Sequence, residues 1–269
     1  MTYWIDRQQR MQQRIADKTI NDINKQLIKY YKSSMKQVIN DFEATYDKLI
    51  ATVGKGKEPT PADLYKLHRF WEQQSQLKRE LTKLGDKEAA LLSKHFEEEW
   101  ISIYNKTHIP TDTAFHIIDV TSAKEMIDKV WLPDGLTYSQ RLWKNIDRLA
   151  ETLNENLIHV VQTGKSTIQL RDLLIDRFNV SINQANTLIT TEVAHIQTEA
   201  AAKKYQDYGL EKYRFFADSD DKTCKHNHDG KKSCHELDGE VFYFKDMKTG
   251  VNAPPMHPRC RCSITGVVE

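Results

Sequence analysis

Residues 20–49 read INDINKQLIKYYKSSMKQVINDFEATYDKL, and the architecture of the N-terminal part follows from them. The apolar side chains of this stretch recur about every 3.6 residues, which is the period of an α-helix. They are Ile20, Ile23, Leu27, Tyr31, Met35, Val38, Phe42, Tyr46 and Leu49. The pattern predicts one long amphipathic helix over residues 6–53. The segment GKGKEPTP at 54–61 ends this helix, because glycine and proline both disfavour its continuation.

A second stretch with helical period runs over residues 61–105. Its apolar side chains are Leu64, Leu67, Trp71, Leu77, Leu81, Leu84, Leu91, Leu92, Phe96 and Trp100. Two long amphipathic helices joined by a short break can bury their apolar faces against each other. We therefore expect an antiparallel helical hairpin, part of whose surface is suited to a partner.

Shorter elements are predicted for the rest of the chain. They are a short helix within 109–130, a turn at 131–135, helices at 138–163, 166–178 and 181–208, and strands at 213–217 and 241–244. Ser166 or Thr167 is expected to cap its helix, and Gly209 to close the last one. The predicted fold is mainly α. It comprises a long helical hairpin and connector over 1–130, a helical body over 131–212, and a small α+β, Cys/His-rich module over 213–269.

Composition excludes several classes of protein. The 269 residues include 39 Lys and Arg and 38 Asp and Glu, which gives a formal net charge of +1. This balance argues against a polycationic nucleic-acid coat and against an acidic disordered tail. No run of about 18 apolar residues is present, so we expect no membrane span. The first residues lack the apolar core of a secretory signal, so we expect a reducing cytosol as the place of synthesis.

Three local motifs resemble known sites but are incomplete. TGKST at 163–167 lacks the glycine that a phosphate loop needs five residues earlier, because His159 occupies that position. Glu192 and His195 have the Glu-x-x-His spacing of a bundle metal site, but a second such unit is missing from the sequence. Aspartates at 218–221 resemble the start of a calcium loop, and the required glycine and glutamate do not follow.

Basic residues follow the side of the first predicted helix opposite its apolar stripe. They are Arg14, Lys18, Lys25, Lys29, Lys32 and Lys36. Such a stripe can contact DNA phosphates or an acidic protein surface. A run of charges is more often a solvated helix face. The candidate contact residues are Lys25, Lys29, Lys32 and Lys36.

The cysteines gather in two motifs near the end of the sequence, TCKHNHDGKKSC at 223–234 and HPRCRC at 257–262. Thiolate and imidazole are ligands of Zn²⁺, and His-x-x-Cys has the spacing of a zinc knuckle. The candidate ligands are Cys224, Cys234, His257, Cys260 and Cys262. Our preferred set is Cys224, Cys234, His257 and Cys260, and the alternative is the four cysteines. Four protein ligands would make the zinc structural, and reduced thiols or disulfides are the other interpretations.

The same motifs resemble the C-terminal signature of phage Mu F-like minor head proteins, also called phage head morphogenesis proteins. The matching positions are Asp220, Cys224, Cys234, Leu237, Asp238, Gly239, Phe242, Pro254, Pro255, His257, Pro258, Cys260, Arg261 and Cys262. Upstream, ITTEVAHIQTEA at 189–200 places Thr191 and Glu192 on the family's Thr-Glu helix. The resemblance covers about residues 131–268. The family usually has two residues between its first two cysteines, whereas nine separate Cys224 from Cys234.

This resemblance implies a virion component inside the head of a tailed phage, present in the host cytoplasm during assembly. It implies association with the portal protein and with capsid or scaffold proteins, a part in head morphogenesis and DNA ejection, and no enzymatic activity. Two alternatives remain open. A metal-dependent nuclease could use Glu192, Asp218, Asp220, His226, His228 and His257. A DNA-binding protein would use the lysine stripe.

Overall fold

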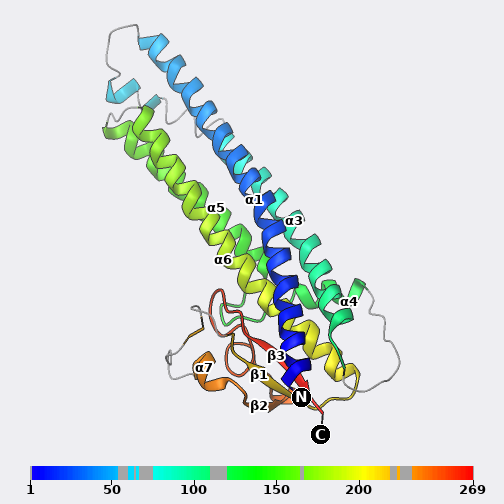
Figure 1. Cartoon of the computed structure of the whole chain (residues 1–269). Coiled ribbons are helices and arrows are strands. Elements are labelled where there is room, and N and C mark those ends of the chain that lie inside the picture. The colour runs from blue at the N-terminus through cyan, green and yellow to red at the C-terminus, as the bar shows by residue number, and fades with distance from the viewer. Residues whose placement is uncertain are drawn as a thin grey trace. The chain divides into compact units, whose positions relative to one another are not determined.

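The computed structural model is mainly helical and carries a small sheet (Figure 1). It describes residues 2–53, 60–63, 65–66, 75–109, 120–163, 167–218, 223–224 and 232–268. The helices are α1 (Thr2–Val53), α3 (Gln76–Lys106), α4 (Val120–Ile127), α5 (Tyr138–Thr163), α6 (Thr167–Asp207), α7 (Cys234–Leu237) and the 3₁₀ turn η1 (Phe244–Asp246). The strands are β1 (Lys212–Phe216), β2 (Val241–Tyr243) and β3 (Ser263–Val267). The predicted fold class, a helical protein with a small Cys/His-rich α+β module, is confirmed.

The long first helix is confirmed, and the second differs from its prediction. Within the described residues, the second helix α3 begins at Gln76 instead of residue 61. Ser75 has a φ of 49°, a left-handed conformation that a right-handed helix cannot contain. Residues 61–63 and 65–66 are helical as well, whereas the predicted apolar positions Leu64, Leu67 and Trp71 lie outside the described residues.

Helix α6 corrects another prediction, because one continuous helix replaces the two expected at 166–178 and 181–208. The intervening residues Asn179 and Val180 are only weak helix formers, each costing up to about 0.7 kcal/mol. Phe178 beside them is fully buried, which stabilises the helix by about 1.5–3 kcal/mol. Burial of this face therefore outweighs the local propensity. Gly209, with a φ of 78°, follows the helix as predicted.

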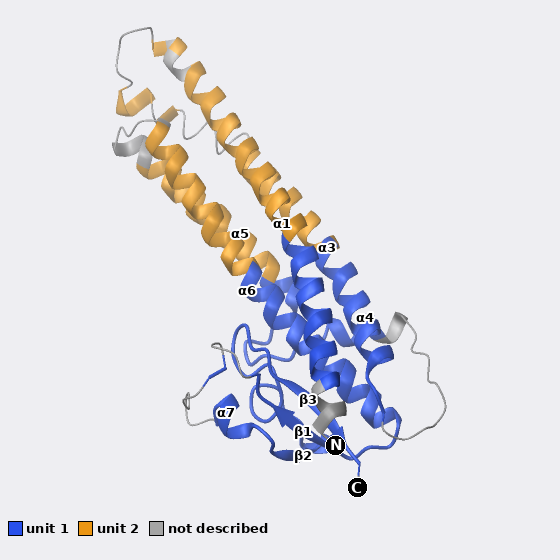
Figure 2. Cartoon of the chain, in the orientation of Figure 1, with its two compact units in different colours: residues 1–24, 91–141, 186–269 blue, residues 25–90, 142–185 orange. Residues whose placement is uncertain are grey.

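The chain forms two compact units, each built from segments that are distant in sequence (Figure 2). Unit 1 comprises residues 1–24, 91–141 and 186–269, and unit 2 comprises residues 25–90 and 142–185. The division predicted at residues 131 and 213 concerns consecutive stretches of sequence and stays a prediction.

Unit 2 is a bundle of segments from α1, α3, α5 and α6. Its buried apolar side chains are Leu27, Val38, Phe42, Leu77, Leu81, Leu84, Leu142, Ile146, Leu149, Leu153, Leu157, Leu170, Leu174 and Phe178. A polar cluster of Tyr31, Glu88 and Ser181 lies within this core. Tyr31 donates its hydroxyl hydrogen bond to Glu88 Oε2 at 3.0 Å, and Ser181 Oγ lies 3.4 Å from the same hydroxyl. Burial raises the pKa of Glu88 to about 7.

Unit 1 confirms that α1 and α3 are antiparallel. Thr19 of α1 donates to Glu99 of α3, and further out Gln8 accepts a hydrogen bond from the backbone of His108. Residue numbers therefore decrease along α1 while those of their partners increase, which is the pattern of antiparallel chains. Buried Phe96 and Trp100 on α3 supply the apolar contact that the sequence pattern predicted.

The sheet of unit 1 has the order β2-β1-β3, and all pairs are antiparallel. The strands predicted near 213–217 and 241–244 are β1 and β2, whereas β3 was not predicted. Its sequence SITGV contains glycine and lacks a strong alternation. Gly266 is required there, because an added Cβ would lie 2.5 Å from Leu210 Cδ2 and 2.6 Å from Tyr205 Cδ1. β3 therefore lies close against the end of α6.

Candidate metal centre

The cysteines of the two motifs come together in the C-terminal part of unit 1. Cys234 is the first residue of α7. Ser233 and Glu236 form a capping box at the N-terminus of this helix. Cys260 and Cys262 lie just before β3. These three cysteines are at most 6% exposed, and Cys224 is half-buried. They pack around Phe215 of β1 and form a small core made largely of sulfur.

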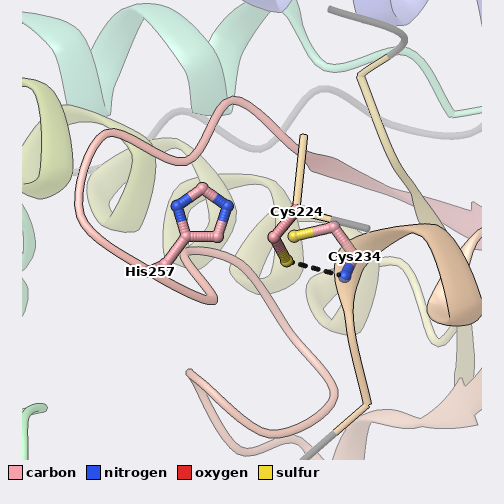
Figure 3. Close-up of side chains that lie close together, drawn as sticks. All are labelled: Cys224, Cys234 and His257. Carbon is pink, nitrogen blue, oxygen red and sulfur yellow. Dashed lines mark hydrogen bonds between the residues drawn. The ribbon is translucent and has the colours of Figure 1, made fainter. Parts of the chain in front are cut away.

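The possible ligand atoms form two groups that share Cys234. One group is Cys224, Cys234 and His257, and the other is Cys234, Cys260 and Cys262. Within each group the ligand atoms lie within 4.8 Å of one another. Figure 3 shows the first group, in which the backbone N–H of Cys234 donates to Cys224 Sγ at 3.1 Å. No disulfide joins any of the four cysteines, all of which lie within the described residues.

His257 has the features of a metal ligand. Its Nδ1 lies 2.9 Å from the carbonyl oxygen of Pro258, a contact that suits an Nδ1–H donor. Its Nε2 is buried and has no hydrogen-bond partner among the described residues. A backbone carbonyl that holds one ring nitrogen commonly directs the other toward a metal. The orphaned Nε2 therefore fits a ligand position.

Electrostatics inside the cluster favour ionisation of one sulfur, that of Cys260. A hydrogen bond from Cys234 lowers the pKa of Cys260, and a further one from Cys262 acts in the same direction. The hydrogen bond to Cys260 correspondingly raises the pKa of Cys234. The neighbouring Cys260 sulfur also raises the pKa of His257, to about 9. Sulfur and imidazole donors select zinc over magnesium or calcium.

Neither group of three completes a tetrahedral site, so four ligands must be drawn from both. The preferred set, Cys224, Cys234, His257 and Cys260, joins the first group to Cys260, with which His257 interacts. The four-cysteine set instead leaves the orphaned Nε2 of His257 unused. The arrangement supports the preferred set as the better fit, and the choice of ligands stays a prediction.

The other signature residues shape and attach this module. Asp238 accepts a hydrogen bond from the backbone of Ala217 at 2.9 Å. Gly239 has a φ of 80° and donates its N–H to the carbonyl of Phe215. Pro255 is buried after a cis peptide bond. The signature position Asp220 lies outside the described residues.

Glu192 lies in a buried network that the sequence did not predict. It is 3% exposed and accepts hydrogen bonds from Trp131 Nε1 at 2.9 Å and from Arg141 at 2.7 Å. Arg141 also pairs with Asp134, and the ring of Trp131 stacks on His195 at 4.2 Å. The network fixes the 131–135 turn against α6. A sequence signal for this helix start existed in the Thr137-x-x-Gln140 capping box.

The residues proposed for a nuclease do not converge in the described part of the chain. Glu192 is engaged by Arg141, and Asp218 pairs with Arg261 at 3.5 Å. His257 belongs to the sulfur cluster, and Asp220, His226 and His228 lie outside the described residues. Within the described residues, the two cysteine-containing groups alone bring three or more possible metal ligands together.

The predicted contact lysines lie in unit 2, in a different unit from the cysteine cluster. All four side chains are exposed on α1. They are Lys25, Lys29, Lys32 and Lys36. Opposite them on the same helix, Leu27, Tyr31 and Val38 are buried. The helix is therefore amphipathic as predicted, and the role of its basic face stays a prediction.

Comparison with known proteins gives one match. Residues 151–265 match the family model described as phage Mu protein F like protein. This region includes α6, the sheet and every candidate zinc ligand. The resemblance drawn from the sequence motifs is confirmed over these residues, which are similar to the phage Mu F-like family. No curated protein and no solved structure matches the chain. Among the described residues, no helix has both the length and the apolarity to cross a membrane.

Proposed function

We propose that this protein is a minor head protein of a tailed phage, acting in head morphogenesis from a place beside the portal protein. The observation that carries the proposal is the family match over residues 151–265. The architecture supports a role in assembly, because the signature residues Asp238, Gly239 and Glu192 make structural contacts. A part in DNA ejection and a non-enzymatic role belong to the same proposal.

Quantitative peptide mass spectrometry of gradient-purified particles tests this function. We expect the chain at a few copies per portal ring, inside particles and protected from external protease. Its presence in the lysate with absence from particles would overturn the virion assignment. Incubation of the purified protein with plasmid and Mg²⁺ or Mn²⁺ provides the enzymatic control. Cleavage that is lost on Asp220→Ala and on His257→Ala would favour the nuclease instead.

We further propose that the cluster binds one structural Zn²⁺ through Cys224, Cys234, His257 and Cys260. The ion would replace a conventional apolar core in a module whose buried centre is largely sulfur. With four protein ligands it keeps no open position for a substrate. Native mass spectrometry of two variants decides between the ligand sets. Cys262→Ser should retain one zinc, and His257→Ala should lose it. The opposite result would establish the four-cysteine set.

The exposed lysines of α1 are the proposed partner surface, for an acidic face of the portal or scaffold protein, or for packaged DNA. Their exposure and common side of the helix support this role. Lys→Glu changes at Lys25, Lys29 and Lys32 should lower incorporation into particles. Affinity for DNA that weakens steeply with salt would identify the nucleic acid as the partner. Normal incorporation and no DNA affinity at low salt would remove the surface from the proposal.

A further inference from the structure

Alternate side chains of the segment His257–Cys262 contact two different parts of unit 1. His257, Cys260 and Cys262 contribute to the sulfur cluster. The interleaved residues Arg259 and Arg261 instead reach the helices of unit 1. The segment therefore connects the candidate zinc site to the helical part of the unit. We call residues 257–262 the clamp segment.

Arg259 attaches the clamp segment to α6. Its backbone N–H donates to Thr191 Oγ1 at 3.1 Å, and its Nε donates to Thr187 Oγ1 at 3.1 Å. Thr187 and Thr191 are one helical turn apart, so the arginine is held along one face of α6. Arg259 itself has a φ of 60°, an unfavourable conformation for a residue with a side chain. Contacts around Arg259 must therefore hold this conformation.

Arg261 attaches the same segment to α1. Its guanidinium lies 3.2 and 3.3 Å from the two carboxylate oxygens of Asp17, and its Nε lies 3.5 Å from Asp218. Asp17 and Arg261 are separated by 244 positions in the sequence. This pair therefore joins the first helix of the chain to the signature motif near its end.

The space between the clamp segment, α1 and α6 is not filled by side chains. A cavity of about 140 Å³ lies there, lined among others by Ile20, Val193 and Cys260. An unfilled gap forfeits the dispersion energy that close packing would supply. The polar contacts of Arg259 and Arg261 thus matter more to the attachment than they would beside a packed interface.

We propose that metal binding at the cysteine cluster docks the clamp segment onto α1 and α6, so that the module works as a metal-dependent clamp on the first part of α1. This inference rests on the proposed zinc site. A tetrahedral ion fixes His257 and Cys260, the two ligands on either side of Arg259, and so removes conformational freedom that docking would otherwise cost. Arg259 and Arg261 can then bind Thr187, Thr191 and Asp17 without a further loss of conformational entropy in the clamp segment. Loss of the ion releases both arginines together.

Hydrogen exchange of the full-length protein, read by mass spectrometry, tests the clamp. Peptides from residues 12–24 of α1 and 187–197 of α6 report on docking, and native mass spectrometry reports zinc on the same samples. The double variant Arg259→Ala/Arg261→Ala should keep its zinc, while both helices exchange roughly two- to fivefold faster. Chelation should accelerate the same peptides by about tenfold or more. Lys245→Ala, which removes an exposed charge from the same module, should leave the peptides unchanged.

The outcomes separate the clamp from the zinc site. If zinc is present and the double variant exchanges like the wild type, the clamp is overturned and the zinc site stands. If the chelator removes zinc and the helices do not respond, the conclusion is the same. If the wild-type protein binds no zinc, both proposals fail together, and the double variant then shows only whether the arginines hold the helices unaided.

Discussion

Replacing Glu88 by glutamine should abolish a large part of the pH dependence of stability. Glu88 is 2% exposed in unit 2, and its polar contact is the hydroxyl of Tyr31 at 3.0 Å. Desolvation is the main cause that raises its pKa, from an ordinary 4.5 to about 7, and the hydrogen bond from Tyr31 offsets part of the rise. In the unfolded chain the carboxyl group returns to water and to the lower value.

The sign and size of the effect follow from proton binding. Between about pH 4.5 and 7 the folded protein keeps the proton on Glu88, whereas the unfolded chain has released it. The folded state therefore binds more protons, and stability falls as the pH rises through this window. One pKa unit corresponds to about 1.4 kcal/mol, so the full loss is about 3 kcal/mol and is complete above about pH 7.

Urea denaturation followed by far-ultraviolet circular dichroism, at about pH 4 and about pH 8, measures this loss. The glutamine of Glu88→Gln stays neutral and can still accept a hydrogen bond from Tyr31. The free energy of unfolding of this variant should therefore fall by about 3 kcal/mol less than that of the wild type from about pH 4 to about pH 8. Other buried carboxylates titrate in both proteins and cancel in the difference. Asp86→Asn, an exposed change on the same helix, is the control and should follow the wild type. If Glu88→Gln changes with pH as the wild type does, within about 1 kcal/mol, the reasoning is refuted.

Three further changes have defined outcomes. Arg141→Ala should destabilise the protein by about 3–5 kcal/mol in urea denaturation, because it leaves the buried carboxylate of Glu192 uncompensated; a loss below about 1 kcal/mol would contradict this. Gly266→Val should cost about 1–3 kcal/mol in the same assay through overlap with the ring of Tyr205, and wild-type stability would show that β3 can shift away. A zinc chelator should lower the Tm of the wild type but not of Cys234→Ser, whose sulfur is common to both ligand groups; equal responses would argue against the site.

Matched controls accompany the first two changes. Arg148→Ala removes an exposed arginine from α5, the helix that also carries Arg141. Ser263→Ala alters another residue of β3 without adding volume beside Tyr205. Both controls should remain within about 0.5 kcal/mol of the wild type, as surface substitutions usually do.

The helices could be predicted from sequence wherever periodicity was long and strong. Helix α5 has the predicted bounds, Tyr138–Thr163, because its inward leucines recur regularly and a turn precedes it. Residues 179–180 show the limit of local reasoning. The sequence predicted a break there, whereas the helix continues beside the fully buried Phe178, and burial is a tertiary effect that local sequence does not report. Strand β3 was missed for a similar reason, since its pairing with β1 and its close approach to Tyr205 are both tertiary contacts.

The candidate metal centre could be predicted as a set of residues but not as a geometry. Cysteine and histidine spacing identified the candidate ligands, because few other roles bring these residue types together. The sharing of Cys234 between two groups arises from tertiary folding and leaves no trace in spacing. The same holds for Arg259, whose partners on α6 lie about 70 residues earlier in the chain. Contacts of this kind follow from the fold and not from a local pattern.

The nesting of the two units in the sequence has a consequence for biosynthesis. Every segment of unit 2 lies before residue 186, so the ribosome can release all of them while much of unit 1 is still unmade. Unit 1 needs residues 186–269 as partners for its first segment, residues 1–24. The start of α1 can therefore pair with α3 early, but its contacts with residues 186–269 must wait for their synthesis, and Asp17 cannot meet Arg261 earlier. Docking of the C-terminal module onto α1 can thus only follow synthesis of the signature motif.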